Sequence, residues 1–133
     1  MDFTDTYLWK KAFVEPRSDS TEKEQRWFQE RFLAFRDKAD MLTKLIIRDM
    51  EWMTIHDVTH LDALWETASI ITNNSIELNP AEAFVLGGSI LLHDSAMSLA
   101  AYQNDINQLK EQQAFKDFFA LEVEKIHRHR KKN

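Results

Sequence analysis

Cysteine is absent from the 133-residue sequence. Disulfide frameworks, thiolate metal sites and cysteine nucleophiles are therefore excluded, and a reducing, intracellular setting fits. No apolar run approaches the roughly 20 residues that span a bilayer, and the opening Met1–Asp5 is not the basic start of a signal peptide. We therefore expect a cytoplasmic protein that does not engage a membrane.

Glycine and proline are also scarce, with two of each in the whole chain. A sheet protein of this size needs many tight turns, and tight turns draw on these residues. The scarcity predicts an all-α fold, a compact helical bundle of long helices joined by short loops.

Basic residues are in the minority, because 17 lysines and arginines face 22 aspartates and glutamates, for a formal charge of −5. Nucleic-acid-binding domains usually carry a basic excess, so a nucleic-acid partner is not expected. A hydrophobic content of 44% with 11% aromatic residues supports a folded chain. We expect one domain over residues 1–133, with a helical extension over 1–50 and a core over 51–133.

Hydrophobic periodicity predicts five helices. They span about residues 5–14, 22–50, 58–73, 80–94 and 105–127. The second begins at a capping box formed by Thr21 and Glu24, and its apolar stripe comprises Phe28, Phe32, Phe35, Ala39, Leu42 and Ile46. The stripe could form a coiled-coil seam, but Trp27, Leu33, Leu45 and Ile47 widen it, which favours packing within the domain.

Both glycines, Gly87 and Gly88, fall inside the helix expected over 80–94. Each costs about 1 kcal/mol there relative to alanine, which indicates close approach of a neighbouring helix. We expect the helix carrying His60 to fill the space at Gly88.

The histidines divide into two groups. His127 and His129 belong to a basic C-terminal tail and are expected to be solvated. His56 and His60 are four residues apart, so on a helix they would share one face and could bind one metal. As a pair they fit ordinary surface or partly buried histidines better than a metal site, and Asp57 between them has the form of a helix N-cap.

His93 and Asp94 follow the apolar run Ile90–Leu92. A carboxylate that leaves a buried segment needs hydrogen bonds, an ion pair or a metal. Adjacent helical side chains diverge by about 100°, so a shared ion would lie between them and accept further ligands from another helix. The pair alone leaves a metal site and a hydrogen-bonded buried pair both open.

Taken together, three segments resemble the HD superfamily of metal-dependent phosphohydrolases. They are Thr54–Leu64, Leu78–Phe84 and Gly87–Asp94. The family pattern has a histidine at the start of one helix, a His-Asp pair at the end of a later one, and a final distant aspartate. The resemblance implies that His60, His93 and Asp94 bind a divalent ion, either manganese, iron, magnesium or zinc.

The same resemblance implies a catalytic role for Asp94, which would bridge a second ion in a binuclear site, and for His56, which would donate a hydrogen bond or proton. The implied reaction is hydrolysis of a phosphate-containing small molecule, such as a nucleotide, by a metal-activated water.

The sequence departs from the family pattern after the pair, which continues Ser95-Ala96-Met97-Ser98 without a glycine turn. Downstream aspartates are limited to Asp105 and Asp117, and neither has a recognisable context. The alternative is a degenerate, non-catalytic HD domain that serves as a regulatory or interaction module. HD domains are often modules of longer chains, so further domains are expected partners. A second copy of this chain, in a homo-oligomer, is the other expected partner.

Overall fold

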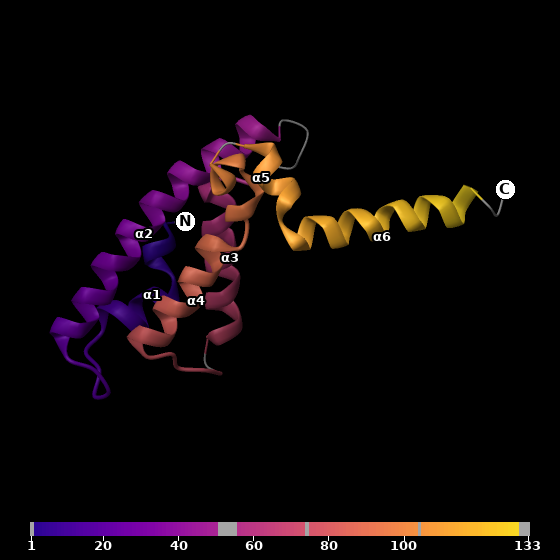
Figure 1. Ribbon diagram of the computed structural model, residues 1–133. Coiled ribbons are helices and arrows are strands. Elements are labelled where there is room, and N and C mark those ends of the chain that lie inside the picture. Colours follow the sequence, from indigo (N-terminus) through magenta and orange to yellow (C-terminus); the bar gives the residue numbers. More distant parts are fainter. Residues whose placement is uncertain (1, 51–55, 74, 104, 131–133) are drawn as a thin grey trace. The chain divides into compact units, whose positions relative to one another are not determined.

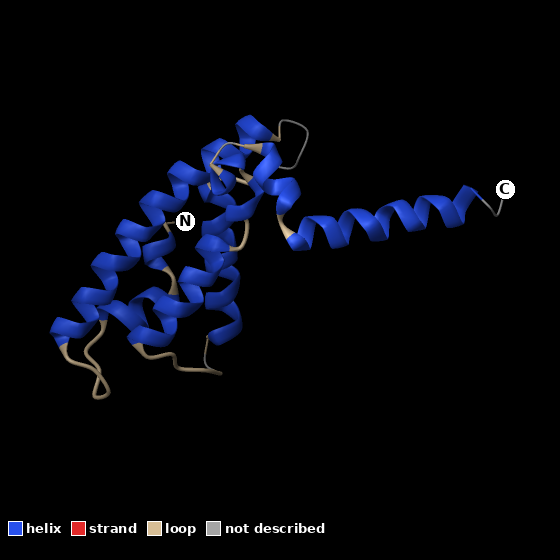
Figure 2. Ribbon diagram, in the orientation of Figure 1, coloured by secondary structure: helices blue, strands red, loops and turns tan. Residues whose placement is uncertain are grey.

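Every element of secondary structure in the described part of the chain is helical, as expected for an all-α fold (Figure 2). The structure is a computed structural model that describes residues 2–50, 56–73, 75–103 and 105–130, the last five as backbone alone. The elements are, in order, η1 (Phe3–Asp5), α1 (Tyr7–Trp9), η2 (Lys10–Val14), α2 (Glu22–Asp49), α3 (Val58–Thr72), α4 (Pro80–Leu92), η3 (Ser95–Met97), η4 (Leu99–Tyr102), α5 (Ile106–Glu111) and α6 (Gln113–Arg130).

Contacts divide the chain into two compact units, residues 1–98 and 99–133. The first unit holds α1 to α4, and the second holds α5 and α6. The expected division of a single domain near residue 50 stays a prediction. No helix among the described residues is long and apolar enough to cross a bilayer.

Reciprocal capping boxes start the long helices of the first unit. Thr21 Oγ1 accepts a hydrogen bond from the Glu24 amide at 3.2 Å, and Glu24 Oε2 accepts one from the Thr21 amide at 2.8 Å. Asn79 and Glu82 repeat the arrangement at α4, where Pro80 occupies the first turn. These side chains satisfy amides that have no partner within the helix, which confirms both expected starts.

The core of the first unit is built around the Phe32 ring of α2. This ring packs edge-on against Trp9 at 5.4 Å and Trp65 at 4.9 Å between centroids. The buried apolar residues come from η1 to α4: Phe3, Leu8, Trp9, Ala12, Phe13, Phe32, Ala39, Leu61, Trp65, Ala83 and Leu91. The α2 stripe therefore packs inside the unit, with α2 lying along α4 (Figure 1).

The expected width of the α2 stripe is wrong at three of its four positions, because Trp27, Leu33 and Ile47 are exposed, whereas Leu45 is partly buried. Their exposure leaves a narrow apolar face, and α2 packs inside the unit through that face. Near the end of α3, Ile71 is 66% exposed. The interior side of α3 is instead polar near its end, where Ser69 is buried against the N-terminal segment.

Polar contacts hold the N-terminal segment on α3. The Thr6 hydroxyl donates to the Phe3 carbonyl at 2.7 Å and accepts from the indole nitrogen of Trp65 at 3.0 Å. The Leu8 amide donates to Ser69 Oγ at 3.0 Å. The buried polar groups of Thr6, Trp65 and Ser69 thus each have a partner, as burial requires.

Gly87 is the glycine that permits close packing. A β-carbon there would lie 2.0 Å from Cε2 of Phe32 and 3.0 Å from Cζ3 of Trp65. At Gly88 it would meet only Phe35 Cε1, at an ordinary contact distance of 3.4 Å. The expectation that the helix carrying His60 fills the space at Gly88 is therefore wrong. Two aromatic rings, from α2 and α3, occupy the space at the neighbouring glycine.

Two helix boundaries also differ from expectation. The helix expected over 80–94 ends at Leu92, and Asp94 has φ −98° and ψ 2°, outside the helix. The helix expected over 105–127 is broken at Gln112, which is extended between α5 and α6. Neither break coincides with a glycine or proline.

Candidate metal centre

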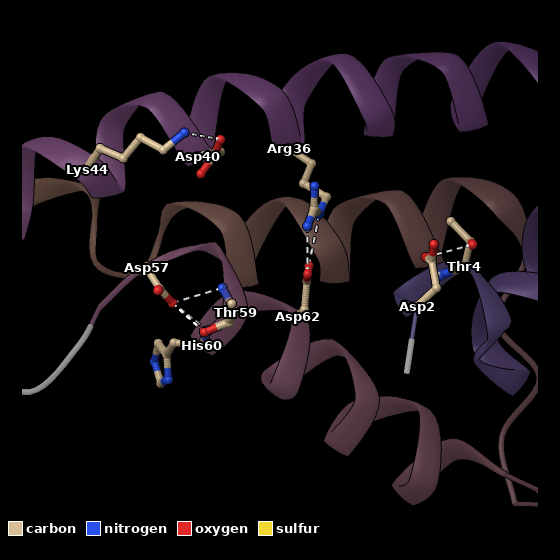
Figure 3. A network of polar contacts seen from close by, with 9 residues as sticks. All are labelled: Asp2, Thr4, Arg36, Asp40, Lys44, Asp57, Thr59, His60 and Asp62. Atoms are coloured by element: carbon tan, nitrogen blue, oxygen red, sulfur yellow. Dashed lines mark hydrogen bonds and ion pairs between the residues drawn. The ribbon is translucent and has the colours of Figure 1, made fainter.

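Asp57 fixes the start of α3 and with it the position of His60. Its Oδ1 accepts hydrogen bonds from the Thr59 amide at 2.9 Å, the Thr59 hydroxyl at 2.5 Å and the His60 amide at 3.3 Å (Figure 3). These bonds, led by the one from the Thr59 hydroxyl, lower the pKa of Asp57 below its ordinary value. The expected N-cap is confirmed.

Two residues after His60, Asp62 ties α3 to α2. The Arg36 guanidinium donates to both Asp62 carboxylate oxygens, at 2.8 and 2.6 Å (Figure 3). The same guanidinium lies 4.5 Å from the centre of the Phe3 ring. A bidentate, half-buried pair of this kind constrains orientation as well as distance, so the first turns of α3 are held on the core.

Removal of the Asp57 side chain should therefore weaken the first turn of α3. We expect Asp57→Ala to cost about 1 kcal/mol of unfolding free energy, a usual loss for an N-cap. Asp57→Asn should cost much less, because asparagine is an equally good cap. Thermal melts of the two variants check this, and equal losses in both would contradict the capping role.

His93 is oriented by the last turn of α4. Its Nδ1 lies 2.6 Å from the Ile90 carbonyl oxygen. A carbonyl only accepts hydrogen bonds, so Nδ1 carries the proton and, in the neutral ring, Nε2 presents its lone pair. Metal-binding histidines commonly have this outer hydrogen bond to a carbonyl or carboxylate.

The Asp94 carboxylate lies at the centre of three imidazoles. Its Oδ2 is 2.9 Å from Nε2 of His93, 3.6 Å from Nε2 of His60 and 4.0 Å from Nε2 of His56. This oxygen is buried, yet no hydrogen bond of acceptable geometry reaches it. The Nε2 lone pair of a neutral His93 faces a carboxylate oxygen, and two acceptors in contact repel unless a proton or a metal cation lies between them.

His60, His93 and Asp94 form a group that could hold that cation. One ligand atom from each residue lies within 4.8 Å of the other two. Two imidazole nitrogens and one carboxylate oxygen suit several first-row transition metals. Three ligands from the protein also leave positions for water or substrate, as in catalytic metal sites. The residues therefore fit a divalent metal ion.

His56 borders this group. Its ring centre lies 5.5 Å from that of His60, and its side chain is 17% exposed. The structure thus brings together all four residues that the sequence singled out. Thr54 and Ile55 of the same motif lie outside the described residues, as do the side chains of His127 and His129.

The two downstream aspartates have local roles in the second unit. Asp105 caps α5 by accepting from the Asn107 amide at 2.8 Å. Asp117 accepts from the side-chain amide of Gln113 at 2.8 Å on the surface of α6.

A contact that the sequence did not predict holds the segment after the His-Asp pair. Ser98, which is 1% exposed, donates from Oγ to Asp49 Oδ2 at 3.0 Å. The bond connects the end of η3 with the end of α2. Neither residue belongs to a recognisable motif, so no sequence signal indicated it.

Comparisons with known proteins give one assignment. No curated protein and no solved structure matches the sequence at a significant level. The model of the HD-CE family matches residues 32–133, which include all four clustered residues and most of the chain. With the His-His-Asp group in place at the facing ends of α3 and α4, the chain belongs to the HD-CE family of HD-type domains.

Proposed function

We propose that the first unit is a metal-dependent phosphohydrolase that acts on a nucleotide or another phosphate ester. The observation that carries the proposal is the buried Asp94 Oδ2, which lacks a hydrogen bond and faces the nitrogens of His60 and His93. That arrangement is unfavourable unless a metal ion or a proton lies between the carboxylate and the imidazole, and a bound metal ion satisfies all three side chains. Membership of the HD-CE family supports the same chemistry.

Each clustered side chain has a distinct role in the proposed reaction. A divalent ion, when bound, would lower the pKa of a bound water and polarise a phosphoryl oxygen. His60 and His93 would supply neutral nitrogens, the latter oriented by its bond to the Ile90 carbonyl. Asp94 would supply the negative charge of the site.

His56 is the candidate general acid. Its Nε2 lies 4.0 Å from Asp94 Oδ2, so it borders the ligand group without belonging to it. A histidine at this position could donate a proton to the leaving oxygen, a contribution of about 10²–10⁴-fold in rate.

The test is hydrolysis of generic phosphate esters by the full chain reconstituted with manganese, iron, magnesium or zinc. We expect His56→Ala to lower kcat by about 10²-fold or more while metal content, read by elemental analysis, stays unchanged. Asp94→Asn should lose both metal and activity. No hydrolysis by the metal-loaded protein above the Asp94→Asn background would refute the proposal.

A non-catalytic interaction module is the second candidate, and one observation favours it. Phe118 and Phe119 of α6 are 63% and 59% exposed, which suits a partner surface. The phenylalanines of α2 contribute less to such a surface, because Phe32 is buried and Phe28 and Phe35 pack against the core. Metal binding without hydrolysis would favour this candidate.

A further inference from the structure

His60 reaches the Asp94 carboxylate from a separate helix, so its distance from that carboxylate depends on how α3 packs. His93 and Asp94 are adjacent in the chain, and His93 is oriented within its own segment by the Ile90 carbonyl. His60 Nε2, in the first turn of α3, lies 3.6 Å from Asp94 Oδ2. A metal site needs its ligands held to within about 0.5 Å and 10–20°. The rotation of α3 about its own axis therefore decides whether His60 can be a ligand.

The cap and the buried face of α3 leave that rotation weakly defined near His60. The bonds that Asp57 accepts all come from the first turn of α3 itself, so they start the helix without orienting it. Burial is non-directional and resists separation from the core more than rotation against it. The hydrogen bonds of the buried face, at Trp65 and Ser69, act further along the helix. The buried side chains lie on one face, at spacings of four, four and three: Leu61, Trp65, Ser69 and Thr72.

The ion pair between Arg36 and Asp62 supplies a second direction. Asp62 follows the buried Leu61 by one residue, so its side chain leaves the helix about 100° away from that residue. The two bonds from the guanidinium to the carboxylate measure 2.8 and 2.6 Å, and the side chains are 21% and 25% exposed. A bidentate pair fixes angle as well as distance. The pair therefore restricts the rotation of α3 two residues after His60 (Figure 3).

Arg36 is itself held in place by the N-terminal segment. Its guanidinium lies 4.5 Å from the centre of the Phe3 ring, and a cation is attracted to the face of an aromatic ring. Phe3 is 8% exposed, packs edge-on against Trp9 at 5.2 Å and stacks on Phe32 at 6.3 Å between centroids. The guanidinium thus connects the aromatic core of the first unit with the first turns of α3.

We propose that Arg36 is a positioning residue of the metal centre. Through Asp62 it holds the rotation of α3, which keeps His60 within ligand distance of Asp94. The inference rests on the metal centre of the proposed function. Arg36 is not a member of the ligand group, so its removal should affect metal binding only while His60 is present.

Titration calorimetry of the full chain with manganese tests the inference. Arg36→Met removes the charge and the donors, and should weaken metal binding about tenfold or more, a usual loss when an outer contact of a metal ligand is removed. In the His60→Ala background, the same substitution should change the remaining affinity by less than about twofold, because two residues that act through one another are not additive. An equal loss in both backgrounds would overturn the proposal, since Arg36 would then act independently of His60.

Gln25 provides a matched control on the same helix. It is buried and donates to the carbonyls of Ala12 and Glu15. It precedes Arg36 by eleven residues, which is about 16 Å along α2 at 1.5 Å per residue. Gln25→Ala should lower the melting temperature, as Arg36→Met does, and leave the manganese affinity unchanged. A similar loss of affinity in Gln25→Ala would overturn the positioning role, because general stability would then govern metal binding.

A second measurement needs no metal and separates this inference from the proposed function. The ring centres of His60 and His93 lie 5.5 Å apart, so nuclear Overhauser contacts between their ring protons should be present in the metal-free wild type. Gln25→Ala should keep these contacts and Arg36→Met should lose them. Contacts that are absent from the wild type, or retained in Arg36→Met, would overturn the positioning role. If the wild type neither binds metal nor hydrolyses an ester, the proposed function fails, and the ring contacts alone decide the role of Arg36.

Discussion

Replacing Asp94 with asparagine is expected to raise the stability of the metal-free protein and to abolish its response to divalent metal. The carboxylate oxygen Oδ2 is buried without a hydrogen bond, 2.9 Å from the Nε2 lone pair of His93. An asparagine amide could donate to that nitrogen. Leaving a buried polar group unsatisfied costs about 1–3 kcal/mol, so we expect a gain of this size in chelator at pH 8.

In the presence of divalent metal, the wild type should become more stable than Asp94→Asn. A ligand that binds only the folded state stabilises it by about 2.7 kcal/mol at one hundred times its Kd, and Asp94→Asn should forfeit this. Melting curves with chelator and with manganese measure both effects. Asp40→Asn, the same chemical change at a surface pair with Lys44, is the control and should keep the full metal response. A metal-free Asp94→Asn protein that melts below the wild type would contradict the conflict inferred between Asp94 and His93.

Gly87→Ala is expected to destabilise the fold, although alanine is the better helix former. The new β-carbon would overlap Cε2 of Phe32, only 2.0 Å away. That ring cannot easily move, because Trp9 and Trp65 pack against it. Overpacking of a dense core typically costs 1–3 kcal/mol, which outweighs the gain of about 1 kcal/mol in helix propensity. Denaturant titration measures the net loss.

Gly88→Ala is the matched control, one residue along the same helix. Its β-carbon would meet only Phe35, at 3.4 Å, so stability should rise by up to about 1 kcal/mol. A double-mutant cycle of Gly87→Ala with Phe32→Leu identifies the cause. The double variant should be more stable than the sum of the single losses predicts. Strict additivity would show that the ring is not the obstacle.

The helix starts could be predicted because their determinants are local. Thr21 with Glu24, and Asn79 with Glu82, satisfy amides within a few residues of themselves. Asp57 does the same for α3. Such bonds depend on spacing in the chain and little on what packs above them, so a sequence pattern is sufficient to find them.

The features that could not be predicted depend on contacts between helices or on where a helix ends without a glycine or proline. The end of α4 at Leu92 carries no glycine or proline, and the His93 ring bonds to the Ile90 carbonyl where two more helical residues were expected. Which of two adjacent glycines faces an aromatic ring depends on the rotation of α4 against α2, and a shift of one residue turns a side chain by about 100°.

The site residues were identified by family resemblance together with spacing, and the structure places them in one cluster. Spacing alone left the His-Asp pair ambiguous between a hydrogen-bonded pair and a metal site. The buried oxygen of Asp94 that lacks a hydrogen bond is compatible with a metal site, and it is a property of the assembled unit.

The attachment of the N-terminal segment to α3 imposes an order on folding during synthesis. Thr6 and Leu8 bond to Trp65 and Ser69, some sixty residues later in the chain. During synthesis this segment therefore leaves the ribosome some sixty residues before its partners on α3. At translation rates of about 5–20 residues per second, the rings of Trp9 and its neighbours lack their α3 contacts for several seconds. A nascent-chain chaperone could bind them in that interval.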